Sequence, residues 1–228
     1  MEVCEGRLAL ANGSEASRVA DALRQRLLTG DLPPGTRLSQ SKLAGEYGVS
    51  RIPVRDALQL LAAEGFLEIG PSMALVRVLS IAELQELYDL RLAVEPMLTR
   101  FAVPNVGLAE VTRMEALEAE MEAGLEPRRW LAANADFHAL VYTRGNRPRM
   151  IELTSQLRRL IDRYLHLHVG MFGDMAPLHA EHRAILDAVR AGNADLAAEL
   201  TREHLANSHR LLLVYLLEHK LLTATSPR

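Results

Sequence analysis

The chain has 228 residues, of which 49% are hydrophobic and 24% charged, and it contains no internal repeat and no long low-complexity run. This composition excludes an intrinsically disordered chain and predicts one or two globular domains. Only 4% of the residues are aromatic, while Leu, Ala, Glu and Arg are abundant, which favours a mainly helical fold. The formal net charge of -3 argues against a protein that coats nucleic acid without sequence preference.

Cysteine content and hydropathy indicate the compartment. Cys4 is the only cysteine, so no disulfide can form within the chain, and a reducing cytoplasm is expected. The first residues carry Glu2 and Glu5 and only a short apolar run, which does not match a signal peptide. No apolar stretch reaches 18 residues, so we expect no membrane partner. Residues 1–16 are expected to form a mobile tail, and residues 223–228 a second tail.

The first predicted helix covers residues 17–29. Val19, Leu23 and Leu27 recur on it at helical spacing and are expected to face the core. A turn-rich connector, LPPGTRL at residues 32–38, follows. The helix is therefore expected to brace the elements that come after the connector.

Residues 39–65, SQSKLAGEYGVSRIPVRDALQLLAAEG, spell two short helices joined by a tight turn. Gly48 suits the left-handed position that closes the first helix. Ser50 is the expected N-cap of the second helix, where its side chain would accept a hydrogen bond from a free amide, and Pro53 fits the first helical turn. The spacing predicts a helix-turn-helix.

Three polar side chains mark one face of the second helix. Arg51, Arg55 and Gln59 follow one another at four-residue steps, so they form one exposed stripe that starts at the helix N-terminus. That end is the one a recognition helix presents to the DNA major groove. Arginines at this spacing are also common on ordinary solvated helices, so the stripe alone leaves both interpretations open. Residues 65–69 and 74–78 look like two paired strands, which would complete a winged helix-turn-helix.

The run PPGTRL, followed by KLAGEYGVSRIPVRDALQLLAAEGFL, resembles the DNA-binding domain of GntR-type bacterial transcription regulators. The resemblance covers about residues 17–78 and implies that Ser50, Arg51, Pro53 and Arg55 approach a double-stranded DNA operator. The full predicted DNA-binding set is Arg37, Ser41, Ser50, Arg51, Pro53, Arg55 and Gln59.

Two positions depart from the family pattern. Ser41 stands where many members have an arginine, and Ala74 stands where the glycine of the wing tip is expected. Residues 18–77 hold eight Lys/Arg against six Asp/Glu, whereas residues 78–228 hold 17 against 20. The basic excess of the predicted DNA-binding domain is slight, so specific binding is expected to depend on the placement of its arginines and on dimerisation.

The rest of the chain, residues 79–222, is predicted to be an all-α bundle of about six helices. Ser80 is the expected cap of the first helix, and the segment around residues 78–81 is the expected hinge between the domains. Such a bundle can enclose a ligand. The predicted helices are 81–102, 107–123, 127–143, 147–168, 176–191 and 194–222.

Three histidines on three predicted helices are candidate metal ligands. His138 follows Asn134 by one helical turn, and His182 and His204 lie on later helices. Three imidazoles and an amide oxygen could converge on one divalent ion, because imidazole suits zinc, nickel and similar metals. Histidines of amphipathic helices also bond simply to their neighbours, so the spacing leaves both interpretations open.

The segments LYDLRLAVEPMLTRFA, NADFHALVYTRGN and EHRAILDAVRAGNADLAAELTREHL resemble the FadR-type C-terminal ligand-binding domain, abbreviated FCD, over about residues 80–218. The resemblance implies a metal held by His138, His182 and His204, and by an aspartate one turn before the first of them. Asn134 replaces that aspartate, which removes a negative charge and is expected to weaken cation binding. The predicted ion is zinc, nickel or manganese.

The effector site is predicted from the same resemblance. By spacing alone, Arg91 and Glu95 would be a surface ion pair. The FCD resemblance instead implies that Arg91 points inward and holds the carboxylate of a small effector. Arg163 and Asn207 are further candidates for this pocket. The remaining histidines of the bundle are expected to be structural or surface residues, namely His166, His168, His179, His209 and His219.

Together these features predict a cytoplasmic, homodimeric transcription regulator, usually a repressor in this family, that binds a palindromic operator and responds to a small carboxylate. Two alternatives stay open. One is a metal-dependent hydrolase built on the histidines, although HAEH is not the HExxH pattern and no GxSxG motif occurs. The other is a dimeric paralogue that has lost DNA recognition, as Ser41 and Ala74 suggest.

Overall fold

The computed structural model describes residues 14–70, 73–169 and 175–219, except for the side chains of Arg163 and of residues 166–169. The chain divides into two compact units, and the division falls between Arg77 and Val78, while the short segment Leu28–Asp31 groups with the second unit. The predicted tails lie outside the described residues, except that α1 already begins at Glu15. The helix starts early because the Ser14 hydroxyl accepts a hydrogen bond from the Ser17 amide, as an N-cap side chain does.

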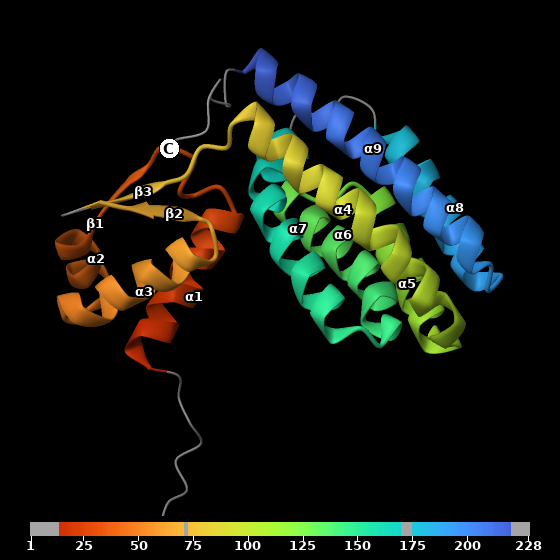
Figure 1. Cartoon of the computed structure of the whole chain (residues 1–228), viewed down its shortest axis with the longest axis horizontal. Coiled ribbons are helices and arrows are strands. Elements are labelled where there is room, and N and C mark those ends of the chain that lie inside the picture. The colour runs from red at the N-terminus through yellow and green to blue at the C-terminus, as the bar shows by residue number, and fades with distance from the viewer. Residues whose placement is uncertain (1–13, 71–72, 170–174, 220–228) are drawn as a thin grey trace, which may run out of the picture. The chain divides into compact units, whose positions relative to one another are not determined.

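The first unit is a winged helix-turn-helix (Figure 1). Its short antiparallel sheet has the strand order β1-β3-β2, so that β3 pairs with both of the other strands. Leu23, Leu58 and Leu61 are fully buried and form its core together with Phe66. The elements are α1 (Glu15–Leu28), β1 (Arg37–Ser39), α2 (Gln40–Tyr47), α3 (Arg51–Ala63), β2 (Leu67–Ile69) and β3 (Met73–Val76).

Strand β1 lies in the stretch that was predicted to be a connector. Arg37 pairs with Leu75, and Ser39 pairs with Met73, so the three residues of β1 gain their hydrogen-bonding partners from a strand that is distant in sequence. Only one of the three, Leu38, is buried. A strand this short shows almost no alternation of apolar and polar residues, which is why the sequence pattern did not reveal it.

The caps of the helix-turn-helix follow the predicted pattern in part. Gly48 closes α2 with a φ of 64°, as expected for a left-handed C-terminal residue. Ser50 has the extended backbone of an N-cap residue of α3, but its side chain makes no cap hydrogen bond, so that part of the prediction is wrong. Ser50 is instead an exposed residue at the start of α3.

Two arginines of the first unit are engaged within it. The Arg24 side chain of α1 donates two hydrogen bonds to the Glu64 carboxylate at the end of α3, at 2.8 and 2.6 Å. Arg26 lies 2.7 Å from Glu46 of α2. The Arg24 pair joins α1 to the end of α3, and the Arg26 pair joins α1 to α2, so both arginines help to hold the helices of the unit together.

The second unit is a bundle of helices in which the long helices α4 and α9 lie side by side (Figure 1). All six predicted helices are present, and residues 220–222 of the last one lie outside the description. None of the described helices is both long enough and apolar enough to cross a membrane. The helices are α4 (Ile81–Ala102), α5 (Leu108–Glu122), α6 (Pro127–Tyr142), α7 (Pro148–Val169), α8 (Ala176–Arg190) and α9 (Ala194–Glu218), with 3-10 turns η1 (Val103–Asn105) and η2 (Thr143–Gly145).

The start of the second unit is fixed by side-chain hydrogen bonds. Ser80 caps α4 in a capping box with Glu83, as the sequence predicts for the cap residue. The amide of the preceding residue, Leu79, donates to the buried hydroxyl of Tyr164 on α7, at 2.8 Å. On the other side of the domain boundary, the Arg77 amide donates to the Phe66 carbonyl of the first unit, at 3.0 Å.

Candidate functional site

The predicted DNA-binding residues lie on the surface of the first unit. Arg51, Arg55 and Gln59 are exposed on α3, while Val54 and Leu58 of the same helix are buried. Arg55 lies 3.3 Å from Asp56, but an ion pair this exposed is weak and leaves the arginine available to DNA. Of the other predicted residues, Pro53 is half-buried, and the exposed ones are Arg37, Ser41 and Ser50.

Ile52, an exposed apolar residue at the N-terminus of α3, was not among the predicted DNA-binding residues. The side chain of Ile52 is 63% exposed, directly between Ser50, Arg51 and Pro53 in sequence. An exposed apolar side chain at the N-terminus of a recognition helix can contact the methyl group of thymine in the major groove. Its position out of phase with the buried Val54 and Leu58 is the signal that could have identified it.

The interpretation of Ala74 as the wing tip is wrong. Ala74 is buried within β3, where it pairs with Leu38 on one side and Ile69 on the other. The hairpin is closed instead by the Gly70 amide, which donates to the Met73 carbonyl at 2.9 Å. Ala74 is therefore a core residue and says nothing about how the wing contacts DNA.

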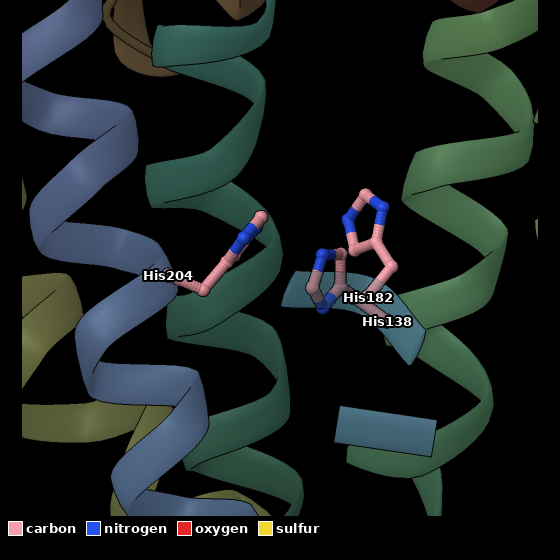
Figure 2. A group of neighbouring side chains, drawn as sticks. All are labelled: His138, His182 and His204. Carbon is pink, nitrogen blue, oxygen red and sulfur yellow. The ribbon is translucent and has the colours of Figure 1, made fainter. Parts of the chain in front are cut away.

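The three predicted metal ligands meet in the helical unit. His138 of α6, His182 of α8 and His204 of α9 point toward one another (Figure 2). Their ring centroids are 5.4 Å apart for His138 and His182, 5.2 Å for His138 and His204, and 4.8 Å for His182 and His204. One ring nitrogen from each lies within 4.8 Å of the other two, so the three can serve one ion.

Unsatisfied polar atoms surround this cluster. Both ring nitrogens of His182, which has no exposed surface, lack a hydrogen-bond partner among the described residues. The amide oxygen of Asn134, buried one turn before His138, lacks one too. Each such atom costs about 1–3 kcal/mol when left unpaired. A donor set of imidazole nitrogens and an amide oxygen fits a divalent ion, which would satisfy the Asn134 oxygen and one of the two His182 nitrogens.

The environment keeps two of the imidazoles neutral. Burial lowers the pKa of His138 well below its usual range, and the positive charge of Arg158 and the neighbouring imidazoles lower it further. Burial also lowers the pKa of His182 well below the usual range, with a further contribution from His204. Neutral imidazole is the form that binds metal ions, so these two are ready for an ion at neutral pH.

Two carboxylates that were not predicted lie beside the histidines. Glu181 Oε2 is 2.8 Å from His204 Nδ1, and Glu118 Oε2 is 3.5 Å from His182 Nδ1, without the alignment of a hydrogen bond. Burial raises the pKa of Glu118 to about 7, opposed by Arg183. Glu118 falls on the apolar stripe of α5, in phase with buried methionines, and this buried polar position is the signal that could have identified it.

His179 and Asn207 each bond to a carboxylate beside the cluster. His179, predicted to be structural or a surface residue, is buried, with Nδ1 3.3 Å from Glu118 Oε1. Its side chain lines a cavity of about 490 Å³ beside Trp130. Asn207, predicted to bind the effector, donates to Glu181 Oε1 at 2.7 Å. Arg163, the other effector candidate on α7, lies outside the side chains that the structure describes.

Arg91 takes part in a buried ionic network. Its Nε donates to Glu95 Oε1 at 2.5 Å. The two residues therefore do pair, but both are buried, so the surface location inferred from spacing is wrong. The other oxygen of Glu95 accepts a hydrogen bond from the Tyr142 hydroxyl at 2.7 Å and lies 3.6 Å from Arg158 Nη1. Although burial alone would raise it, the pKa of Glu95 is lowered, because Arg91 and Arg158 stabilise the ionised form.

The network retains capacity for a further anion. Arg91 Nη1 is buried and has no hydrogen-bond partner among the described residues. Arg158, which was not predicted, lines a cavity of about 200 Å³ between α6 and α7 together with Tyr142, Thr154 and Asp162. Burial raises the pKa of Asp162, opposed by the positive charges of Arg158 and Arg91.

Two family models match the chain. The model of bacterial regulatory proteins of the gntR family matches residues 15–74, and the FCD domain model matches residues 86–207. The chain belongs to the GntR family of transcription regulators with an FCD domain. This GntR-family chain is therefore a DNA-binding regulator and not an enzyme.

Relatives of this GntR-family regulator include proteins named as repressors. It is 39% identical over 105 residues to the gluconate operon transcriptional repressor of Bacillus licheniformis, covering 46% of this chain and 42% of that protein. It is 30% identical over 204 residues to a probable D-xylose utilization operon transcriptional repressor of Paenarthrobacter nicotinovorans, covering 86% of this chain and 88% of the relative. The chain thus spans less than half of the first protein but most of the second.

A solved structure confirms the predicted fold. The structure of E. coli McbR/YncC matches with a TM-score of 0.78 and 24% identity, covering 90% of this chain and 99% of McbR. The GntR-family chain therefore has the predicted mainly α architecture, a winged helix-turn-helix followed by an all-α bundle.

Proposed function

We propose that the protein is a homodimeric transcriptional repressor whose affinity for a palindromic operator changes when its FCD domain binds a small carboxylate next to a divalent metal ion. The observation that carries the proposal is the buried cluster of His138, His182 and His204, with the arginine network beside it. The names of the gluconate and D-xylose relatives support the role of repressor. Because it acts on the chromosome of a bacterium, we place it in the cytoplasm.

The metal is proposed from the donor set. Asn134 and the three histidines offer an amide oxygen and three imidazole nitrogens, which suits zinc, nickel or manganese. A bound ion would supply a positive charge that attracts the carboxylate of the effector. The chain holds the ligands in place from three helices, and the bundle around them excludes water.

The effector class is proposed from the buried charges. Arg91 and Arg158 are two buried guanidinium groups beside Glu95 and Asp162, and the planar fork of a guanidinium group suits the carboxylate of an effector. Arg91 Nη1 is the donor that remains for it. The effector can change DNA affinity only by favouring one arrangement of the two units, so the proposed response is a population shift.

The homodimer is proposed from an exposed apolar stripe on α4. Leu90, Met97 and Phe101 are 41%, 52% and 37% exposed, and their spacing places them on one face of the helix. A second copy of the chain would cover this face. A two-fold symmetric dimer would then meet a two-fold symmetric operator.

The test of DNA recognition is capture of genomic fragments from the source organism by the purified full chain at physiological salt, followed by sequencing. We expect fragments that share a short palindrome. No enrichment, with or without added divalent ion, would favour the dimeric paralogue that has lost DNA recognition.

The test of the metal is elemental analysis of protein purified without chelators, and again after incubation with zinc, nickel and manganese. We expect one ion per chain in the wild type and none in His182→Ala. Absence of metal from the wild type under both conditions would contradict the metal site but not the DNA-binding role.

A further inference from the structure

Two acidic side chains lie directly behind the histidine cluster, and neither belongs to the proposed ligand set. Glu181 comes from α8 and Glu118 from α5. Glu181 Oε2 lies 2.8 Å from Nδ1 of His204. Glu118 Oε2 lies 3.5 Å from Nδ1 of His182. In both pairs the carboxylate therefore approaches the Nδ1 side of the ring.

This arrangement determines which nitrogen of each ring is left for an ion. A neutral imidazole carries one N–H, and a carboxylate beside Nδ1 favours the tautomer in which Nδ1 holds the hydrogen. The lone pair is then on Nε2. For His204 the hydrogen-bond distance is already reached, whereas for His182 the carboxylate lies 3.5 Å away and must also rotate into line with Nδ1 to complete the bond.

Each carboxylate is also held from its other side. Asn207 donates to Glu181 Oε1 at 2.7 Å, and His179 Nδ1 lies 3.3 Å from Glu118 Oε1. The two carboxylates thus bridge a histidine of the cluster to a second side chain outside it. Such paired contacts fix the orientation of a carboxylate, so its charge stays at a defined distance from the cluster.

We propose that Glu118 and Glu181 are positioning residues of the metal site, which hold His182 and His204 in the Nδ1–H tautomer and supply the negative charge that Asn134 lacks. Three neutral imidazoles and an amide leave the charge of a divalent ion uncompensated. The carboxylates behind the rings offset part of this charge without touching the ion, and a bound ion would in turn favour the ionised form of Glu118, whose pKa burial raises to about 7. The inference rests on the proposed metal site, and it assigns Asn207 the role of holding Glu181.

The experiment compares zinc affinity among variants of the full chain, measured by competition with a chromophoric chelator. We expect Glu118→Gln and Glu181→Gln each to bind zinc about 10–100-fold more weakly than the wild type. Glu203→Gln is the matched control, because Glu203 is exposed on α9 beside His204 in sequence and carries the same charge. Its affinity should equal that of the wild type.

A rescue variant separates positioning from a general loss of structure. Asn134→Asp restores a carboxylate next to the ion, so Asn134→Asp combined with Glu118→Gln should recover about tenfold in affinity over Glu118→Gln alone. A variant that merely folds poorly would not recover. Thermal unfolding of the metal-free proteins provides the check on folding.

The outcomes are distinct. Unchanged affinity in both glutamine variants would overturn the inference. Complete loss of zinc from Glu118→Gln, as expected for His182→Ala, would also overturn it, because Glu118 would then be a ligand, together with His179 and His182. A wild-type chain that binds no zinc would instead overturn the proposed metal site itself.

Discussion

Arg51 and Arg55 of the first unit are exposed on one face of α3, whereas Arg91 and Arg158 of the second unit are buried around Glu95. The same side chain serves a different purpose in each place. An exposed arginine stays hydrated, so it adds almost no desolvation penalty to the free energy of folding, and it can be replaced without disturbing the core. A buried arginine must be neutralised by a partner, so its function and the stability of the fold cannot be separated.

Replacing both exposed arginines should have the largest effect on DNA binding and almost none on folding. Arg51→Ala with Arg55→Ala removes the two side chains that we expect to contact bases or phosphates, contacts worth about 2–6 kcal/mol together. Operator binding measured by fluorescence anisotropy should fall at least about 30-fold. The melting temperature should stay within about 2 °C. Undiminished binding would favour the paralogue without DNA recognition.

Removing the charge of Glu95 should destabilise the helical unit. Glu95→Gln removes the carboxylate that pairs with the buried Arg91 and Arg158, at a cost of about 3–5 kcal/mol in the free energy of unfolding. The matched control is Glu199→Gln on the exposed face of α9, which should change stability by less than about 0.5 kcal/mol. Chemical denaturation of each variant gives these values.

The same comparison has a defined pH dependence. The folded-state pKa of Glu95 is lowered, so its stabilisation is complete above the unfolded value of about 4.3 and is lost as the pH falls below it. The difference between wild type and Glu95→Gln should therefore shrink on acidification. A difference that stays constant between pH 7 and pH 3 would contradict the charged state assigned to Glu95.

A charge on the exposed apolar stripe of α4 should separate the protomers. Met97→Asp places a carboxylate where the second copy is proposed to pack, and we expect a monomer in sedimentation at micromolar concentration. Met97→Leu is the conservative control and should remain dimeric. A dimeric Met97→Asp would show that another face joins the protomers.

The smallest expected effect tests the backbone of the helix-turn-helix. Gly48 has a φ of 64° and space around it, so Gly48→Ala should cost about 1–2 kcal/mol through backbone strain alone. Gly45, inside α2 with equal space and ordinary φ, provides the control. Gly45→Ala should stabilise the unit by about 0.5–1 kcal/mol. Equal effects at both sites would contradict the left-handed turn.

Much of the first unit was predictable because its signals are local. Gly48, Pro53 and the stripe from Arg51 to Gln59 lie within a dozen residues, and each depends only on its own helix or turn. The exceptions have non-local causes. Strand β1 exists because β3 supplies its partners, and Ala74 was misplaced because the register of the hairpin decides which residue forms its tip.

Of the buried site, only the three histidines could be predicted from the sequence. His138, His182 and His204 came from the FCD resemblance, whereas spacing along the chain left them uncertain. Glu118 lies on α5, where three of the other four glutamates are exposed, so only the phase of the apolar stripe distinguishes it. Glu181 is a half-buried position of α8 that no sequence pattern distinguishes from the surface. Likewise, a pair such as Arg91 and Glu95 has the same spacing whether it is exposed or buried, and packing against other helices decides which.

The boundary between the units leaves very little free chain. The Arg77 amide is bonded to Phe66 in the first unit and the Leu79 amide to Tyr164 in the second, so Val78 is the one residue between these two anchors. The DNA-binding unit can reorient about this connection only by rotation around the few backbone bonds near Val78. Such a tether has little conformational entropy, so lengthening it with glycines should weaken the proposed effect of an effector on operator affinity.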